Sequence, residues 1–485
     1  MKIGKNWFME DGAPLDDIRE NFMTPPREYR PNMFWFWIDK APDPENYREQ
    51  AAGMAKQGIS CGYAQDRGFN WKTPDLYFEC FDAALDETKK AGLTMGYCER
   101  ACYLKGDEFR GGDPDMTAVT LGCKAITVRR GEKAAFEKGF FTVSARISDD
   151  GLIDSDSVSL IPNDVSEFFA EDGDYRVFPF YKYTAATMEG CKSNLLCRKA
   201  ADRAMKTIHE PYLKRYAGEA GKTLSGHFFD WEGAYGYKLA YSTELETAFR
   251  ERTGDELRLI CPLLLEKDVQ GKWMRARYNW FDTVSELYAD INFGIASDKL
   301  AEYGMYYLVH LWEEHLLGKA LLAGDPMRVY RAVTMPAIDH LFKDFNRVCS
   351  YKEAQSVCEF DGKRFADELL GCCGWELKPD ELRSSVNNAL SLGVSNFIPH
   401  GAYSRRDDIK KAGYAPDFFD WSPMWEHFGQ CADYMTRGAF IISKGHMDAD
   451  TLLYNPLESV WALLGDHAFD DTISNDGGWL YDKPD

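Results

Sequence analysis

Residues 33–98 read MFWFWIDKAPDPENYREQAAGMAKQGISCGYAQDRGFNWKTPDLYFECFDAALDETKKAGLTMGYC, and this stretch decides the fold class. Three short apolar runs alternate in it with two amphipathic segments of helix length, 43–56 and 73–90. The runs are Met33–Ile38, Ile59–Ala64 and Leu93–Cys98. Short strands that alternate with helices predict βα units and a parallel sheet.

The same alternation returns later in the chain. Residues 106–183 interrupt it with alternating Val, Phe and Thr segments, which predict an inserted β-rich module. Five further strands are predicted at Thr223–Phe229, Met305–Val309, Ala337–Leu341, Ala354–Cys358 and Val394–Ile398. Eight strands with intervening helices predict a (β/α)8 TIM barrel with a β-rich insertion after strand three. The alternative is a doubly wound sheet. It needs a glycine-rich loop after the first strand, where this chain has Asp39-Lys40-Ala41-Pro42.

These patterns predict a division into four parts. Residues 1–30 form an N-terminal lead, and residues 31–105 with 184–440 form the catalytic barrel. Residues 106–183 are the inserted module, and residues 441–485 are a C-terminal extension, a candidate for the start of a missing accessory domain.

Composition excludes several classes of protein. The 485 residues include 45% hydrophobic and 14% aromatic residues, so the chain is neither disordered nor fibrous. The formal net charge of −21 argues against nucleic acid or an anionic membrane as a partner. No apolar run reaches the roughly 18 residues of a transmembrane helix. The start of the chain lacks the apolar segment of a secretory signal, so we expect a cytoplasmic protein with reduced thiols.

Polar and aromatic residues follow the predicted strands. In a TIM barrel the catalytic groups come from the carboxyl ends of the strands. Glycoside hydrolysis needs two carboxyl groups, one to protonate the leaving oxygen and one ionised. Glu232 and Glu359, after strands four and seven, are the predicted catalytic pair. The predicted substrate-binding residues are Trp35, Trp37, Asp66, Arg67, Glu99, Asp230, His310, Glu313, Glu314, Asp339, His340, Trp375 and His400.

A catalytic metal is the rival interpretation of the same residues. His310 and His315 are five residues apart, whereas the H-E-x-x-H zinc motif places its histidines four apart on one helical face. Asp339, His340 and His400 are further candidates for ligands. We predict no metal and no cofactor.

Five ordered stretches resemble the family 106 α-L-rhamnosidases and related bacterial glycoside hydrolases. Gly226-His227-Phe228-Phe229-Asp230-Trp231-Glu232 resembles the strand that ends in T-D-E-P in that group. His310-Leu311-Trp312-Glu313-Glu314 resembles its G-H-L-x-x-E segment. The other similar stretches are 324–341, Gly371-Cys372-Cys373-Gly374-Trp375-Glu376-Leu377 after Glu359, and 393–400 leading to Tyr403.

The resemblance implies a glycosidase with Glu232 as general acid and Glu359 as base or nucleophile, and adds Tyr403 to the substrate contacts. It implies inversion, whereas strand-four and strand-seven acids in other barrel glycosidases more often imply retention. Some relatives use calcium, which stays an alternative to the absence of a cofactor. The expected partner is a carbohydrate or glycoside, and homo-oligomer formation is left open. The chain departs from the group at 98–103 and 230–233. The alternative function is therefore a carbohydrate-binding barrel without catalysis.

Overall fold

The computed structural model describes residues 14–38, 42–66, 74–98, 113–184, 193–230, 235, 239–311, 320–343, 348–405 and 415–464. Eight parallel strands close into a barrel in the order β1-β16-β15-β14-β13-β11-β3-β2. The strands are β1 (Asn32–Trp37), β2 (Cys61–Asp66), β3 (Thr94–Cys98), β11 (Leu224–Asp230), β13 (Tyr306–His310), β14 (Met335–His340), β15 (Ala366–Leu369) and β16 (Asn396–Tyr403). The predicted fold class, a TIM barrel with a β-rich insertion, is confirmed.

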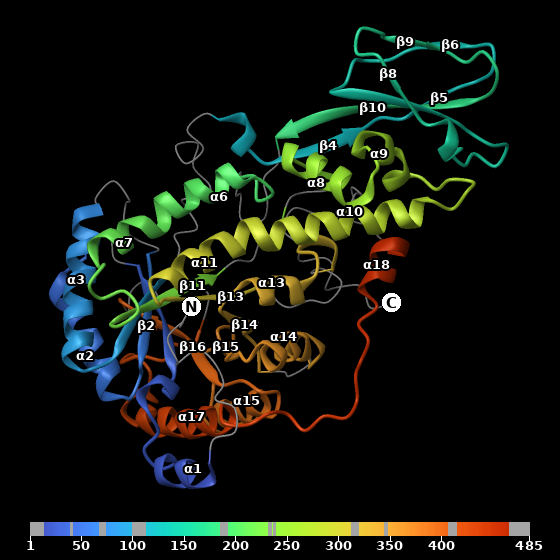
Figure 1. The fold of residues 1–485 in the computed structure, drawn as a ribbon. Helices are drawn as coiled ribbons and strands as arrows, with labels where there is room; N and C mark the ends of the chain where they lie inside the picture. Colours follow the sequence, from blue (N-terminus) through green and yellow to red (C-terminus); the bar gives the residue numbers. More distant parts are fainter. Residues whose placement is uncertain are drawn as a thin grey trace.

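Helices surround this barrel (Figure 1). They are α2 (Pro44–Lys56), α3 (Pro74–Lys90), α6 (Arg198–Ala204), α7 (Glu210–Arg215), α10 (Trp273–Leu287), α11 (Ile295–Glu302), α13 (Pro326–Ala332), α14 (Val348–Asp361), α15 (Pro379–Ser391) and α17 (Phe428–Ile442). Two π-helical segments, η6 (Met205–His209) and η7 (Tyr288–Gly294), continue α6 into α7 and α10 into α11. The other helices are α1 (Leu15–Asn21), α8 (Thr243–Thr253), α9 (Leu257–Leu265) and α18 (Leu457–Leu464), with short 3-10 turns η2 (Arg27–Tyr29), η3 (Pro114–Met116), η4 (Ser155–Ser157) and η8 (Trp425–His427).

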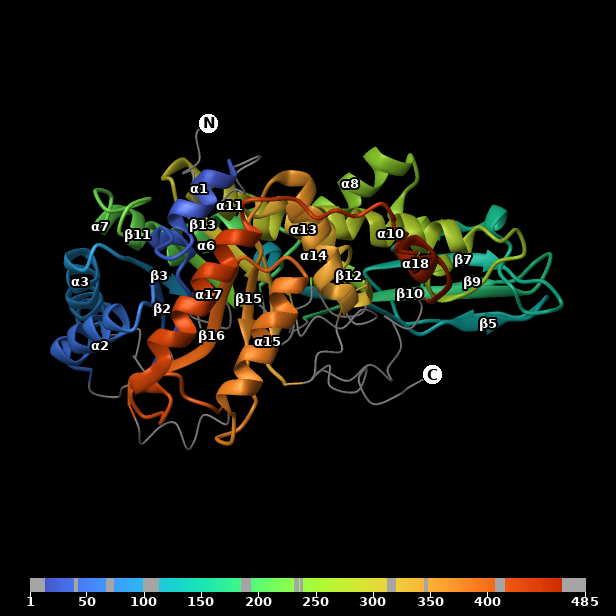
Figure 2. The ribbon, with the colours of Figure 1, turned by 90° about the horizontal axis from the view of Figure 1, so that it is seen from below.

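The insertion after β3 forms its own sheets and projects to one side of the barrel (Figures 1 and 2). Its main sheet has the order β12-β4-β10-β7-β8, with β5 also paired to β10, and a second sheet pairs β6 with β9. The strands are β4 (Val119–Cys123), β5 (Ile126–Val128), β6 (Lys133–Ala135), β7 (Phe141–Arg146), β8 (Ser159–Ile161), β9 (Glu167–Phe169) and β10 (Tyr175–Thr184). Strand β12 (Leu239–Tyr241) comes from the connection after β11, so this sheet is joined to the barrel.

Two apolar layers hold the barrel together. Side chains alternate along a strand, so each strand sends one set inward and the other toward the helices. On β1, Phe34 and Phe36 belong to the cluster inside the barrel. Trp35 and Trp37 belong to the larger cluster between the barrel and the helices. Within the described residues, no helix is long and apolar enough to cross a membrane.

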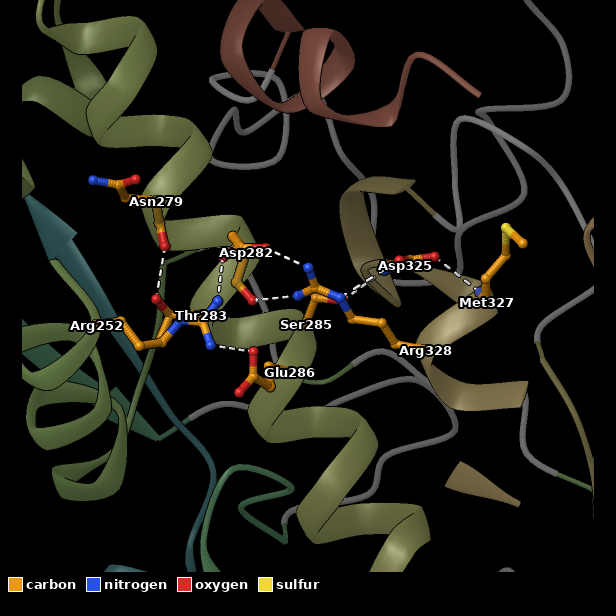
Figure 3. A network of polar contacts seen from close by, with 9 residues as sticks. All are labelled: Arg252, Asn279, Asp282, Thr283, Ser285, Glu286, Asp325, Met327 and Arg328. Carbon is orange, nitrogen blue, oxygen red and sulfur yellow. Dashed lines mark hydrogen bonds and ion pairs between the residues drawn. The ribbon is translucent and has the colours of Figure 1, made fainter. Parts of the chain in front are cut away.

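An ion-pair cluster joins three helices outside the barrel (Figure 3). Asp282 on α10 binds Arg252 of α8 and Arg328 of α13, and Arg328 Nη1 also donates to the Asp282 carbonyl at 2.8 Å. The Asp282 side chain is 12% exposed, while Arg252 and Arg328 are 33% and 32% exposed. Arg252 also pairs with Glu286, and Arg328 with Asp325 at 3.5 Å, so Asp282 is the nearly buried carboxylate that the two arginines share.

Replacing Asp282 by Ala is expected to lower the free energy of unfolding by about 2–3 kcal/mol. This is less than the ~3–5 kcal/mol of a fully buried ion pair, because water reaches both arginines. Urea denaturation followed by tryptophan fluorescence measures the change. Asp298→Ala, at an exposed position of α11, is the control and should change stability by less than about 0.5 kcal/mol. Equal effects of the two substitutions would contradict this account.

Candidate active site

Polar side chains converge inside the barrel at the carboxyl ends of its strands. Asp230 ends β11, His310 ends β13, and Glu368 lies one residue before the end of β15. His310 is fully buried, Glu368 is 2% exposed, and the Asp230 side chain is 13% exposed. Three strands thus contribute two carboxyl groups and one imidazole to the base of the barrel mouth, where TIM-barrel enzymes carry their chemistry.

His310 lies between the two carboxyl groups. Its Nε2 atom is 3.4 Å from Asp230 Oδ1 and 3.2 Å from Glu368 Oε2. Its Nδ1 atom is 3.2 Å from the carbonyl oxygen of Leu311, which can only accept a hydrogen bond. Because both ring nitrogens face acceptors, the form that satisfies every contact is the doubly protonated imidazolium.

The electrostatics agree with this geometry. Burial lowers the pKa of His310, but hydrogen bonds to Asp230 and Glu368 and the negative charges of Asp339 and Glu368 outweigh it. The net result holds the pKa of His310 well above its usual range. A charged His310 in turn favours the ionised forms of the two carboxyl groups beside it.

Neighbouring strands complete the cluster. Gln65 on β2 donates from Nε2 to Asp230 Oδ2 at 2.9 Å. His400 on β16 places its Nε2 atom 3.7 Å from Glu368 Oε1. Edge contacts of the His400 ring with Phe34 and Phe36, at centroid distances of 5.5 and 4.8 Å, orient it. Both oxygens of Glu368 therefore face a histidine.

Asp339 adds a third carboxyl group to the same part of the barrel. It is 2% exposed and shares its face of β14 with Met335 and Ala337, which line the barrel interior. The mouth therefore contains three buried or nearly buried acids near one imidazolium. Within the described residues, acidic groups therefore outnumber basic ones in this cluster.

The fit of a metal ion to this cluster can be tested on its donor atoms. Ligand atoms of Asp230, His310 and Glu368 lie within 4.8 Å of one another. A metal ion between them would have to replace the proton on His310 Nε2. Calcium takes about six to eight oxygen ligands, whereas this trio offers two carboxylates and an imidazole. The trio does not fit calcium, and the absence of a cofactor stays a prediction.

The predicted role of two tryptophans is not supported by their positions. Trp35 and Trp37 are 1% and 0% exposed and point away from the barrel axis. Trp35 Nε1 donates to Gln50 Oε1 of α2 at 2.8 Å, and Trp37 packs on Tyr47 at a centroid distance of 4.1 Å. Both belong to the layer between strands and helices, so no sugar reaches them. The inward residues of β1 are Phe34 and Phe36.

Of four other predicted residues, two lie at the carboxyl end of the barrel and two point toward the surrounding helices. Tyr403 is at the mouth, where it stacks on Phe36 at 4.9 Å, and Trp375 is 57% exposed on the connection after β15. His340 faces outward, with a ring contact to Tyr351 of α14 at 6.0 Å. Asp66 shares its face of β2 with Ala64 of the outer layer, so the structure directs it away from the barrel axis.

Glu359 is far from the predicted position. The strand predicted at Ala354–Cys358 was wrong, because these residues are part of helix α14. Glu359 lies in the last turn of α14, from which the chain enters the amino end of β15, opposite the mouth. It accepts hydrogen bonds from His446 Nδ1 at 2.8 Å and from the Met447 amide at 3.0 Å. The structure therefore does not bring Glu359 to the mouth.

Several predicted residues lie outside the described residues, and two described ones were missed. Those outside are Arg67, Glu99, Glu232, Glu313 and Glu314. Glu368 and Gln65 were not predicted. The signal for Glu368 was a pair of adjacent acids, Asp367 and Glu368, enclosed by the apolar residues Phe365–Ala366 and Leu369–Leu370 just before Gly371.

No family model matches the chain. The chain is 22% identical over 276 residues to a putative β-glucuronidase of Formosa agariphila, a match that covers 55% of this chain and 23% of that protein. Among solved structures, a rhamnosidase from Novosphingobium sp. PP1Y has a TM-score of 0.69 at 14% identity, covering 88% of this chain and 61% of that one.

A β-galactosidase from the haloarchaeon Halorubrum lacusprofundi has a TM-score of 0.50 at 12% identity, covering 90% of this chain and 62% of that one. The chain thus spans less than two thirds of the length of each of these proteins. At these identities the solved structures show a shared fold.

Proposed function

We propose that this chain is a glycoside hydrolase that cleaves an O-glycosidic bond with a pair of carboxyl groups. The observation that carries the proposal is Glu368, a buried acid at the carboxyl end of a barrel strand with a histidine near each oxygen. The names of the similar proteins, a rhamnosidase, a β-galactosidase and a putative β-glucuronidase, support the same class. The exposed Trp375, on the connection after β15, is the proposed aromatic face for a sugar ring.

The proposed role of Glu368 is that of the ionised carboxylate. A proton donor must keep its proton at working pH, and a carboxylate beside an imidazolium holds one poorly. Glu368 therefore acts as the general base or the nucleophile. The proton donor should be a carboxyl group without such a cation, and Glu232, two residues after Asp230, is our candidate.

The stereochemical outcome depends on the distance between the two carboxyl groups. A separation of about 5–5.5 Å gives retention, and one of about 6.5–9.5 Å leaves room for a water and gives inversion. Proton NMR of the first anomer released distinguishes the two outcomes.

The proposed sugar is neutral and rhamnose-like. Asp230, Asp339 and Glu368 can accept hydrogen bonds from sugar hydroxyls, but they would repel the carboxylate of a uronic acid. The resemblance of the sequence motifs and the TM-score of 0.69 to a rhamnosidase support an α-L-rhamnoside.

We expect an aryl α-L-rhamnoside to be hydrolysed with a kcat/KM at least about 100-fold above that of the matched aryl β-glucuronide, since like charges in a buried site cost several kcal/mol. The assay compares aryl glycosides of several neutral sugars and the glucuronide under one set of conditions. Preference for the glucuronide would contradict the neutral-sugar assignment. Sugar binding by folded protein without turnover of any substrate would favour a non-catalytic carbohydrate-binding barrel.

A further inference from the structure

The insertion carries two tyrosines on one face of its main sheet. Tyr181 and Tyr183 lie two residues apart on β10, so they point to the same side, and their ring centroids are 6.4 Å apart. Tyr183 is 48% exposed, whereas Phe178 and Phe180 on the opposite face are fully buried. We call Tyr181, Tyr183 and the strand beneath them the tyrosine platform.

Gly122 explains how Tyr183 lies on this sheet. Gly122 on β4 is paired with Tyr181, and a Cβ atom built on Gly122 would lie 2.6 Å from Cε2 of the Tyr183 ring. The ring therefore covers the backbone of Gly122, and any other residue there would displace it. A large aromatic ring is thus spread across the sheet with nearly half of its surface open to water.

Polar groups border the platform. The Tyr181 hydroxyl donates to the carbonyl oxygen of Glu137 at 3.0 Å, which fixes the orientation of that ring. The register partner of Tyr183 is Thr120, whose side chain lies on the same face of the sheet. Burial and the charge of Glu137 raise the pKa of Tyr181, so its ring stays neutral. Rings flanked by hydroxyl groups match a ligand with both C–H faces and hydroxyls.

The platform is joined to the candidate active site through the chain. Strand β4 pairs on its other side with β12, with Thr120 opposite Ala240. Strand β12 begins nine residues after Asp230, the acid of the barrel mouth. The connection after β11 thus runs from the site to the sheet that carries the platform.

We propose that the tyrosine platform binds a saccharide unit of a neutral oligosaccharide substrate, beyond the unit held in the barrel. The inference rests on the proposed glycosidase function. Sugar rings stack their C–H faces on aromatic rings, and such contacts need no charge on the ligand. The net charge of −21 and the neighbouring Glu137 disfavour an anionic chain in the same place.

The test uses two variants that act on the platform in different ways. Tyr183→Ala removes the exposed ring, and Gly122→Ala keeps the ring but displaces it. Phe169→Ala is the matched control, because Phe169 is a 55% exposed aromatic residue on β9 of the separate two-stranded sheet. Near-ultraviolet circular dichroism shows that each variant is folded.

Binding is measured by affinity electrophoresis of the full chain carrying Glu368→Gln, so that no substrate is consumed. The probes are rhamno-, galacto-, manno- and xylo-configured neutral polysaccharides, with polygalacturonate as the anionic comparison. We expect Tyr183→Ala and Gly122→Ala to weaken binding of one neutral polysaccharide by about 10-fold, and Phe169→Ala to leave it unchanged. In the catalytic background, all three should hydrolyse aryl monosaccharides at the wild-type rate.

The outcomes separate the two proposals. Equal binding by all variants, or binding of polygalacturonate alone, would overturn the platform even if aryl glycosides are cleaved. Loss of polysaccharide binding in the two platform variants of a chain that cleaves no glycoside would support the platform and contradict the glycosidase.

Discussion

Glu368→Gln is expected to lower kcat on the best aryl glycoside by about 10²–10⁴-fold, the usual contribution of a positioned acid or base. Glutamine keeps the size of the side chain but cannot accept a proton or form a covalent glycosyl intermediate. Its one carbonyl oxygen can still accept from one of the two histidines that face Glu368 in the wild type. KM should change little by comparison, because the loss falls mainly on the chemical step.

Glu359→Gln is the matched control for that experiment. Glu359 lies at the opposite end of the barrel and bonds His446 and Met447. Its replacement should leave kcat within about 2-fold of wild type, as for a surface residue far from the chemistry. A large loss with Glu359→Gln together with normal turnover by Glu368→Gln would reverse our assignment.

His310→Gln is expected to lower the free energy of unfolding by about 3–5 kcal/mol near neutral pH. The substitution leaves Asp230 and Glu368 buried without the cation between them, and an uncompensated buried charge is strongly destabilising. Activity should fall as well, because Glu368 loses the charged imidazole 3.2 Å from its Oε2 atom.

The pH dependence of this stabilisation follows from the direction of the pKa shift. The pKa of His310 is raised in the folded protein above its unfolded value of about 6.5. The charge on His310 therefore stabilises the fold in full below about pH 6.5, and this stabilisation is lost as the pH rises through the raised pKa. The stability gap between wild type and His310→Gln should shrink from pH 6.5 to 10 in urea titrations. The control is His427→Gln, at an exposed position, which should be as stable as wild type at every pH. A stability difference between wild type and His310→Gln that widens as the pH rises would contradict a charged His310.

Most of the barrel is predictable from local pattern. The short apolar runs at 33–38, 59–64 and 305–309 correspond to β1, β2 and β13 within two residues. The insertion is predictable because its alternating segments, such as 175–183, differ from the helical periodicity on either side.

Strand seven could not be recognised in the same way. Ala354–Cys358 is short and mostly apolar like a strand. The buried residues of the helix that contains it, among them Tyr351, Ala354 and Cys358, follow helical spacing. The true strand, Ala366–Leu369, is four residues long and half of it is acidic. A strand with two acids can be buried there because both acids have partners. Glu368 faces the histidines, and Asp367 accepts a hydrogen bond from Tyr351 at 2.8 Å.

When every residue of a strand is apolar, the sequence also does not show which side chains face the barrel interior and which face the helices. In Met33–Ile38 the sequence does not distinguish Phe34 and Phe36, which face inward, from the two tryptophans that face the helices. The polar strand ends Asp230, His310, Asp339 and His400 were easier to predict, because buried acids and imidazoles in a barrel need partners and find them at its mouth.

In the proposed reaction, Glu368 provides a negative charge to a sugar held in the barrel mouth. The most direct measurement is calorimetric binding of the cationic iminosugar that matches the hydrolysed sugar, to wild type, Glu368→Gln and Glu359→Gln. We predict that the iminosugar binds wild type and Glu359→Gln equally, and Glu368→Gln about 10–100-fold more weakly, the effect of a charged hydrogen bond. Equal affinity for wild type and Glu368→Gln would contradict the claim.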